Sequence, residues 1–433
     1  MKRTSTKTAL VALILLSFAL ANAGAQSPFV DDGFFAPPQA KAPWLLDWGG
    51  TVSPAVLSES QGEPLSLVTG LSGNVWVRLS LPAGWQYYAR IRDNALLTVL
   101  PVDAGFELVN LWEVNANYLQ LTEADAGFSL ALGRKAFQLG SGLVLSGNGD
   151  GVEAQLNNQL FSAKAFGFYT GLLEPGFSAV YALDSWDDEN GAWRYIGGYS
   201  LGIGLYGQEL ALLGLYQGDF GQGSQPYTSW YSGLQAKGML LGGEYLVEGY
   251  LEEGRGPDGA AIDAFAATAR YNRVFKLATT PGVTIQYSVA SGDPDRTAGD
   301  GSAGNASGTD LAFQAFGQVS SGSVFRPYFS NIHIAQLGAS FRPLERAGAL
   351  LRDSSLGARY FYYAKYDKAG VVNVDDAPLS SHDLGHGVDL MVRWAPWNDV
   401  STFLNAGAFL PGAAFPAGEA IRFTVSGGMS LSF

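Results

Sequence analysis

The stretch that decides the fold is IRFTVSGGMSLSF, residues 421–433. Its odd-numbered positions are apolar or Gly, and its even-numbered positions are polar or Gly. Successive side chains of a β-strand point to opposite faces, so the alternation predicts a strand with one apolar face and one polar face. Such a strand fits a membrane β-barrel, with hydrocarbon outside and water inside, and it also fits the amphipathic strands of a soluble β-sandwich.

The first residues of the chain favour the membrane alternative. Lys2, Arg3 and Lys7 precede an apolar run at 9–21, and the small residues 23–25 follow it. This layout is that of a secretory signal peptide, and we place its cleavage after residue 25. The run is shorter than the roughly 20 residues that a membrane-spanning helix needs. The sequence therefore predicts a signal peptide at 1–25 and a single β-barrel domain at 26–433.

The composition agrees with a barrel and excludes several other classes. The chain has 56 Gly, 25 Phe, 20 Tyr and 10 Trp, and only 15% of its residues are charged. Glycine marks turns, and aromatic side chains collect where a barrel meets the membrane surface. The absence of Cys excludes disulfides, thiolate metal sites and a cysteine nucleophile. A net charge of −13 argues against a nucleic-acid partner, because phosphate binding requires a basic surface.

The length of the chain sets the size of the barrel. Each membrane strand takes about 9–11 residues, to which a turn or loop is added. Eight strands would leave far too many residues for each strand, and no linker marks a second domain. We expect an antiparallel, up-and-down transmembrane barrel of about 18 strands, with 16 as the alternative. A barrel of that size encloses a water-filled lumen.

The alternation also assigns side chains to the two faces. In residues 75–81 the odd positions are apolar, so Arg78 falls on the inner face. Residues 107–121 and 128–137 change phase midway, which indicates bulges. The same reasoning places ten basic candidates in the pore lining: Arg78, Arg90, Arg92, Lys164, Arg270, Arg342, Arg359, Lys365, Arg393 and Arg422. It places five acidic candidates there: Glu113, Glu153, Glu244, Glu248 and Asp389.

This excess of inward cations predicts a preference for anions. Fixed charges in low-dielectric walls raise the local concentration of ions of opposite sign. The alternative interpretation is that any charged side chain in a barrel strand must face water, whether or not it selects a solute.

No pattern predicts catalysis, a metal or a cofactor. The polar stretch 291–310 has Ala298 and Gly304 where an EF-hand loop requires Gly and Glu. The Gly-rich segment 202–207 lacks the strand-turn-helix context of a dinucleotide site. His382 and Asp383 are neighbours in a loop, and two such neighbours do not form an orienting chain of hydrogen bonds.

Several short motifs, in order along the chain, carry a family resemblance. LGRKAFQLG at 132–140 with DGV at 150–152, and ASGD at 290–293, resemble strand segments of the alginate-export family. LGHGVDL at 384–390 and AFLPG at 408–412 resemble that family's closing strand and turn, although Gly387 stands where the family pattern has Glu. The resemblance spans about 127–433. It implies an 18-stranded barrel with an arginine-lined pore for anionic polysaccharide.

The last strand is also similar to the terminal strand of bacterial outer-membrane barrels, in which a final Phe serves assembly. We therefore expect Phe433 to be an assembly signal for the barrel-assembly machinery, and the chain to lie in the outer membrane of a Gram-negative-type bacterium. Its other expected partners are outer-membrane lipid and anionic saccharides or small anionic solutes. The expected function is passive diffusion or export of such solutes, as in a porin. The alternative is a surface-exposed, adhesin-type barrel with a closed pore, and an outer-membrane hydrolase is a third possibility.

Overall fold

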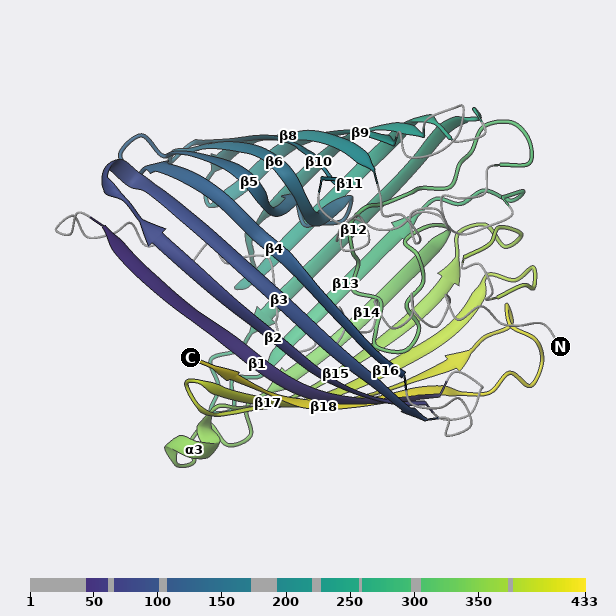
Figure 1. Cartoon of the computed structure of the whole chain (residues 1–433). Coiled ribbons are helices and arrows are strands. Elements are labelled where there is room, and N and C mark those ends of the chain that lie inside the picture. Colours follow the sequence, from purple (N-terminus) through teal and green to yellow (C-terminus); the bar gives the residue numbers. More distant parts are fainter. Residues whose placement is uncertain are drawn as a thin grey trace.

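Eighteen β-strands form one closed antiparallel ring (Figure 1). The computed structural model describes residues 44–60, 66–100, 107–172, 193–219, 227–256, 259–296, 305–372 and 377–433, so the predicted signal peptide lies outside the described residues. The strands are β1 (Leu45–Ser60), β2 (Ser66–Ser80), β3 (Trp85–Leu100), β4 (Glu107–Glu123), β5 (Phe128–Leu139), β6 (Leu145–Asn157), β7 (Phe161–Tyr169), β8 (Arg194–Leu205), β9 (Gln208–Asp219), β10 (Thr228–Leu240), β11 (Gly243–Arg255), β12 (Ala261–Val274), β13 (Gly282–Ala290), β14 (Ile332–Phe341), β15 (Ser354–Lys365), β16 (Asp383–Trp397), β17 (Val400–Pro411) and β18 (Arg422–Ser432).

The ring is closed by its first and last strands. Each strand pairs with the next along the chain, and β1 pairs with β18 from Thr51 opposite Ser432 to Ser60 opposite Phe423. Closure leaves no unpaired strand edge, which is what a strand structure in hydrocarbon requires. The predicted fold is confirmed, with 18 strands rather than 16.

The two rims of the barrel differ in the length of their connections. Short turns, such as 206–207 and 241–242, lie at one rim together with the short helix α3 (Ala349–Arg352) and the 3₁₀ turn η1 (Pro82–Gly84). The long connection between β13 and β14, residues 291–331, leaves from the other rim, at the right of Figure 1. In outer-membrane barrels the short turns face the periplasm. Among the described residues, no helix is long and apolar enough to cross a bilayer.

The two faces of the wall follow the predicted alternation. Val75 and Ile91 are each 53% exposed on the outer face, where hydrocarbon would cover them. Arg78, on the same strand as Val75, forms an ion pair with Asp47 on the inner face. The outer wall therefore has the apolar band that a membrane barrel needs.

The predicted phase changes have two different structural causes. In β4 the register against β3 shifts between Arg90 and Ile91, and Asn115 is the extra residue, so the predicted bulge is present. In β5 the pairing with β6 is continuous, but β4 pairs only with residues 128–134 of β5. The rest of β5 leaves the wall with β6 as a hairpin.

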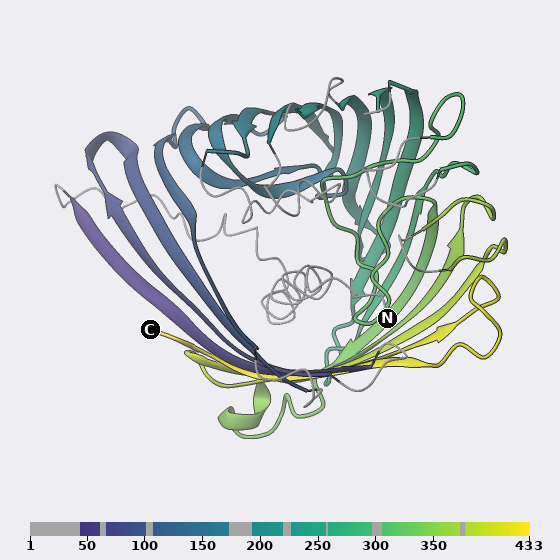
Figure 2. The same cartoon turned by 45° about the vertical axis from the view of Figure 1, so that its right-hand side comes forward.

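This hairpin and the β13–β14 connection enter the lumen and pack together (Figure 2). The backbone N–H of Phe316 donates to the carbonyl of Val144 at 2.8 Å, and Gln318 donates to Gly142 at 3.0 Å. Phe137 and Phe316 are both fully buried in one large apolar cluster. The inner wall is therefore not polar throughout, because part of it forms a core with these two segments.

Candidate functional site

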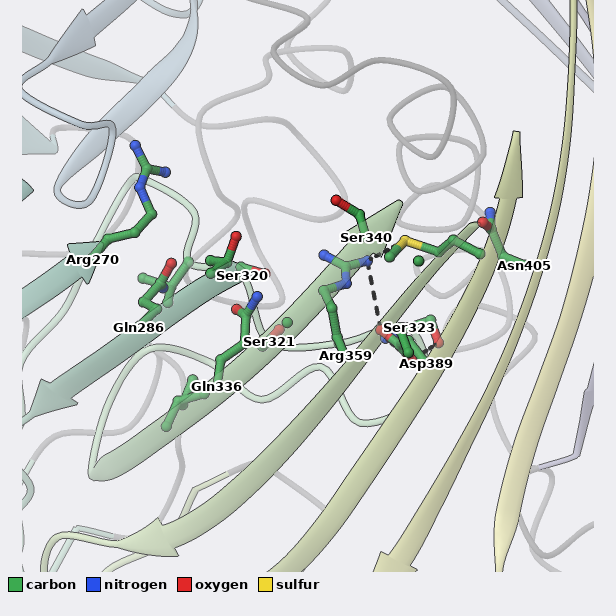
Figure 3. Close-up of a pocket in the computed structure, with 18 of the residues that line it drawn as sticks. Arg270, Gln286, Ser320, Ser321, Ser323, Gln336, Ser340, Arg359, Asp389 and Asn405 are labelled. Carbon is green, nitrogen blue, oxygen red and sulfur yellow. Dashed lines mark hydrogen bonds and ion pairs between the residues drawn. The ribbon is translucent and has the colours of Figure 1, made fainter. Parts of the chain in front are cut away.

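A cavity of about 1030 Å³ lies in the lumen between the β13–β14 connection and the inner wall (Figure 3). Residues 314–323 of the connection form one side, and strands from β12 to β18 form the other. Side chains from the wall include Gln286, Gln336 and Asn405, and those from the connection include Ser320. The cavity is thus lined by polar groups on both sides.

The lining of this cavity is strongly basic. Four of the predicted pore cations meet there, although they come from three strands and the turn after β14. Two further arginines, at the end of β12 and in the connection, were not predicted. The six arginines are Arg270, Arg273, Arg326, Arg342, Arg359 and Arg393. Asp389 is the single acidic side chain of the described lining.

Asp389 holds the connection in place. Its Oδ1 accepts a short hydrogen bond from the Ser323 hydroxyl and another from the Ser323 backbone N–H at 3.3 Å. The nearest Nη of Arg359 is 3.7 Å from its Oδ2, and a dashed line in Figure 3 marks this ion pair. The Asp389 carboxylate can offset the charge of one arginine, Arg359, so the described lining with its six arginines keeps a net positive charge.

A glycine allows the connection to make this turn. Gly322 has a φ of +93°, a conformation that side chains with a Cβ rarely adopt. A Cβ at this position would also lie 2.7 Å from the hydroxyl of Tyr363. That hydroxyl donates to the carbonyl of Ser321 at 2.6 Å. The turn is therefore fixed from both sides at the cavity wall.

A second group of predicted cations lies on β2 and β3. Arg78 Nη2 is 2.5 Å from Asp47 Oδ2. Arg90 Nε donates to the side-chain oxygen of Asn115 at 3.0 Å. In addition, Arg92 is 3.6 Å from Glu113. Arg78 and Arg92 are thus paired with carboxylates.

Three predicted cations contact the luminal hairpin or the connections between strands. Lys164 Nζ donates to the carbonyl of Gln138 at 2.7 Å. Lys365 is only 2% exposed and donates to the carbonyls of Ala377 and Leu379, at 2.8 and 3.1 Å. Arg422 is 3.2 Å from Glu419 and packs on two rings, with Phe415 at 5.2 Å. Their inward direction is as predicted, but their partners are parts of the protein.

Two of the acidic candidates, Glu153 and Glu248, also contact other parts of the protein. Glu153 forms an ion pair with Lys135. Glu248 is 1% exposed and accepts from the backbone N–H of Ser141 at 2.8 Å, which fixes the tip of the β5–β6 hairpin. Glu244 is exposed and stands opposite Asn272 near the rim.

Glu252 is a further buried carboxylate that binds a luminal segment, as Glu248 does, but it was not among the predicted pore-lining residues. Glu252 is fully buried and accepts from the hydroxyls of Tyr227 and Tyr231, each at 3.0 Å, and from the backbone N–H of Gln314 at 2.8 Å. Its inward position follows from its even spacing with Glu248 on β11. Its partner Gln314 lies 62 residues away, however, so no local pattern in the sequence predicts this contact.

The β13–β14 connection contains its own ion pair. Arg296 Nη1 is 2.6 Å from Asp310 Oδ2, and both side chains are buried. Burial raises the pKa of Asp310, and the nearby Arg296 opposes this effect. The pair links two parts of the connection that are 14 residues apart.

The described residues contain no cluster of three or more His, Asp or Glu that could hold a metal ion. His333 and His386 are hydrogen-bonded to Tyr287 and Tyr360, each at 2.7 Å. His382 Nδ1 lies 3.0 Å from the carbonyl of Lys365. None of these histidines is hydrogen-bonded to a serine or to a carboxylate among the interactions described.

Known structures share this fold. The outer membrane protein opdK from Pseudomonas aeruginosa has a TM-score of 0.56 and 12% identity, covering 90% of this chain and 98% of its own. OccAB1 of Acinetobacter baumannii has a TM-score of 0.55 and 10% identity, with 90% and 97% covered. OccK5 (OpdH) of P. aeruginosa has a TM-score of 0.54 and 10% identity, with 90% and 98% covered.

Comparison by sequence gives a family for the C-terminal part. No curated protein matches the chain. Residues 223–423, which contain β10 to β17 and most of the arginine-lined cavity, match the alginate export family. The match confirms the resemblance predicted from the motifs, and it extends further toward the N-terminus than the two closing motifs. Residues 223–423 thus resemble the alginate export family, and the whole barrel has the fold of the outer-membrane proteins named above.

Proposed function

We propose that this outer-membrane channel conducts anionic solutes, acidic saccharides among them, by passive diffusion through the lumen. The observation that carries the proposal is the cavity with six arginines and one acidic side chain, Asp389, which is engaged with Ser323 and Arg359. Fixed cations between low-dielectric walls attract anions and slow cations. The proposed function includes no chemical step.

The long connection strengthens this effect. Because residues 314–323 occupy part of the lumen, a solute on that side passes close to the arginines of the wall. Charge acts strongly over such short distances, since the Debye length is about 10 Å at 0.1 M salt. A permeating anion would therefore remain within reach of several guanidinium groups.

The test is a planar-bilayer recording of the reversal potential in a KCl gradient. The wild type is expected to be anion-selective, and the triple change of Arg270, Arg359 and Arg393 to Glu should shift it toward cations. The shift should be smaller at 1 M salt, where the Debye length is only ~3 Å.

Arg352→Glu provides the matched control, because Arg352 is exposed on α3 at the rim. This variant should keep the wild-type selectivity. Unchanged selectivity in the conducting triple variant would contradict the proposal. A wild type without any conductance would favour the surface-exposed, adhesin-type alternative.

A further inference from the structure

The closed ring has no edge strand, but β4 is paired on both sides over only part of its length. On one side, residues 107–121 of β4 pair with β3. On the other side, β5 pairs only with residues 117–123, and among the described residues no strand pairs with 107–116 there. Figure 1 shows β4 and β5 diverging toward the rim of the long connections. We call the unpaired side of residues 107–116 the open edge.

The open edge arises because the β5–β6 hairpin bends from the wall into the lumen. Gly133 lies at the bend, opposite Tyr118 of β4, and has a φ of +128°, which residues with a Cβ rarely adopt. A Cβ added to Gly149, on the β6 side of the bend, would collide with the Phe168 ring. Glu248 then holds the tip of the hairpin through the N–H of Ser141 at 2.8 Å. The open edge is therefore built into the fold.

Backbone groups on the open edge need a hydrogen-bond partner that hydrocarbon cannot supply. The N–H and C=O groups of alternate residues in an antiparallel strand point to opposite neighbours, so about half of those in 107–116 point away from β3. Among the described residues, the Val114 carbonyl has one such partner, Nη1 of Arg134 at 3.5 Å. Non-helical backbone at membrane depth is stable only where protein buries it or water reaches it. Water at the open edge would satisfy the remaining groups.

Polar side chains on the outer face agree with water at this part of the wall. Asn110 is an exposed, outward residue of β4. Asp93 stands opposite Trp112, two residues after the outward Ile91, and is also exposed. A carboxylate is costly in hydrocarbon, so Asp93 indicates that water reaches the outer face beside the open edge.

A cleft of about 400 Å³ lies on the outer face across the gap from the open edge, where β6 leaves the wall. Gly167 and Gly197 stand opposite each other in register and line this cleft. Tyr169 and Tyr195, which also line it, are stacked with 4.5 Å between their ring centroids. Glycines beside aromatic rings leave a shallow apolar furrow that suits an alkyl chain.

We infer that the open edge borders a lateral portal, through which an amphipathic anion enters or leaves the lumen sideways. Its alkyl tail would lie toward the outer leaflet, because the open edge is in the half of β4 away from the short turns, which face the periplasm. Its charged head would meet luminal cations such as Arg90, whose Nε donates to Asn115 beside the open edge at 3.0 Å. This route goes beyond the proposed function, since it joins the lumen to the membrane.

Hydrogen–deuterium exchange of the full chain in lipid nanodiscs tests whether the open edge is wet. About half of the amides in peptides from 107–116 should exchange rapidly, because their N–H groups point away from β3. Peptides from 117–123 of β4 and 91–98 of β3 are paired on both sides and should stay protected. Equal protection of 107–116 and 117–123 would overturn the inference and indicate that a strand of a partner protein covers the open edge.

Single-cysteine variants test the portal itself, because the chain has no cysteine of its own. Leu111 and Ser72 both face the lumen in one row of the wall, with Asn94 between them. Leu111 lies on the open edge, whereas Ser72 lies on β2 and is paired on both sides, so Ser72→Cys is the matched control for Leu111→Cys. The probe is a phospholipid whose head group carries a maleimide, which is an amphipathic anion confined to the bilayer of the nanodisc.

The rate with a water-soluble maleimide corrects each site for its accessibility from the lumen. After this correction, Leu111→Cys should react with the lipid-borne maleimide on the order of tenfold faster than Ser72→Cys, since confinement beside the portal raises its effective concentration. Retained heat-modifiable migration in gels shows that each variant is folded. Equal corrected rates would overturn the inference, because the lipid would then reach both cysteines only over the rim. Such a result would leave the anion selectivity of the proposed function, which the bilayer recording measures, untouched.

Discussion

At the scale of single residues, basic side chains that all point to the inside of the barrel have different roles. Arg270 borders the cavity and is exposed, whereas Lys365 is buried and donates to two carbonyl groups of the β15–β16 connection. Alternation along a strand determines which face a side chain occupies. The groups that surround that side chain inside the barrel come from segments distant in the sequence. These groups decide whether a cation selects solutes or stabilises a loop.

Arg270→Met and Lys365→Met should therefore have opposite effects. Loss of Arg270 removes a fixed charge from the cavity, so anion selectivity should fall while stability stays near that of the wild type. Loss of Lys365 removes the side-chain donor to the buried Ala377 carbonyl, while the Leu379 carbonyl keeps the Ser381 N–H, and an unsatisfied buried acceptor costs about 1–3 kcal/mol. Reversal potentials and the temperature at which the barrel unfolds in gels measure the two effects. A selectivity change in Lys365→Met larger than that in Arg270→Met would contradict this division.

At the scale of elements, buried carboxylates of the wall fix the luminal segments. Glu248 binds the tip of the β5–β6 hairpin at Ser141, and Glu252 binds the β13–β14 connection at Gln314. Asp389 binds the same connection at Ser323. A carboxylate offers several acceptor sites to the N–H and O–H groups of a turn, and this suits it to such an anchor.

These contacts mark the limit of what the sequence predicts. The facing of Arg78 or Arg359 follows from a period of two, which is a local property of the sequence. The length of the chain predicts a barrel of about 18 strands, with 16 as the alternative, and the family resemblance implies 18. The hairpin inside the lumen depends on the pairing of Ser141 with Glu248, 107 residues apart. In the sequence only the phase change in residues 128–137 accompanies the hairpin, and such a change predicts a bulge.

Glu252→Gln should loosen the β13–β14 connection. An amide places an NH₂ group where the carboxylate accepted hydrogen bonds, so either the two tyrosine hydroxyls or the Gln314 N–H loses its acceptor. We expect more frequent current fluctuations in bilayer recordings, with the barrel still folded. Glu253→Gln, one residue away and exposed, is the control. If the current through the Glu252→Gln channel fluctuates no more than that of the wild type, other contacts hold the connection.

At the scale of the whole molecule, the barrel depends on the junction between β1 and β18. Phe433 donates to and accepts from the backbone of Gly50, at 3.1 and 3.0 Å. Its ring packs edge-on against Trp48, with 6.4 Å between the centroids. Every other pair of neighbouring strands in the ring is adjacent in sequence, so this junction alone joins the two ends of the described barrel.

Deletion of Phe433 and the change Gly50→Val should both lower the yield of heat-modifiable barrel in outer-membrane fractions. Deletion removes two backbone hydrogen bonds and the ring that we propose the barrel-assembly machinery recognises. A Cβ at Gly50 would lie 2.8 Å from the Phe433 ring and 2.5 Å from the Asn74 carbonyl oxygen, so valine would force the junction apart. Gly73→Val on β2 is the matched control, because the nearest atom to a Cβ there is 3.7 Å away. If the chain without Phe433 reaches the outer membrane as efficiently as the wild type, Phe433 is not an assembly signal. If Gly50→Val alone then reduces the yield, the packing of the junction is what assembly requires.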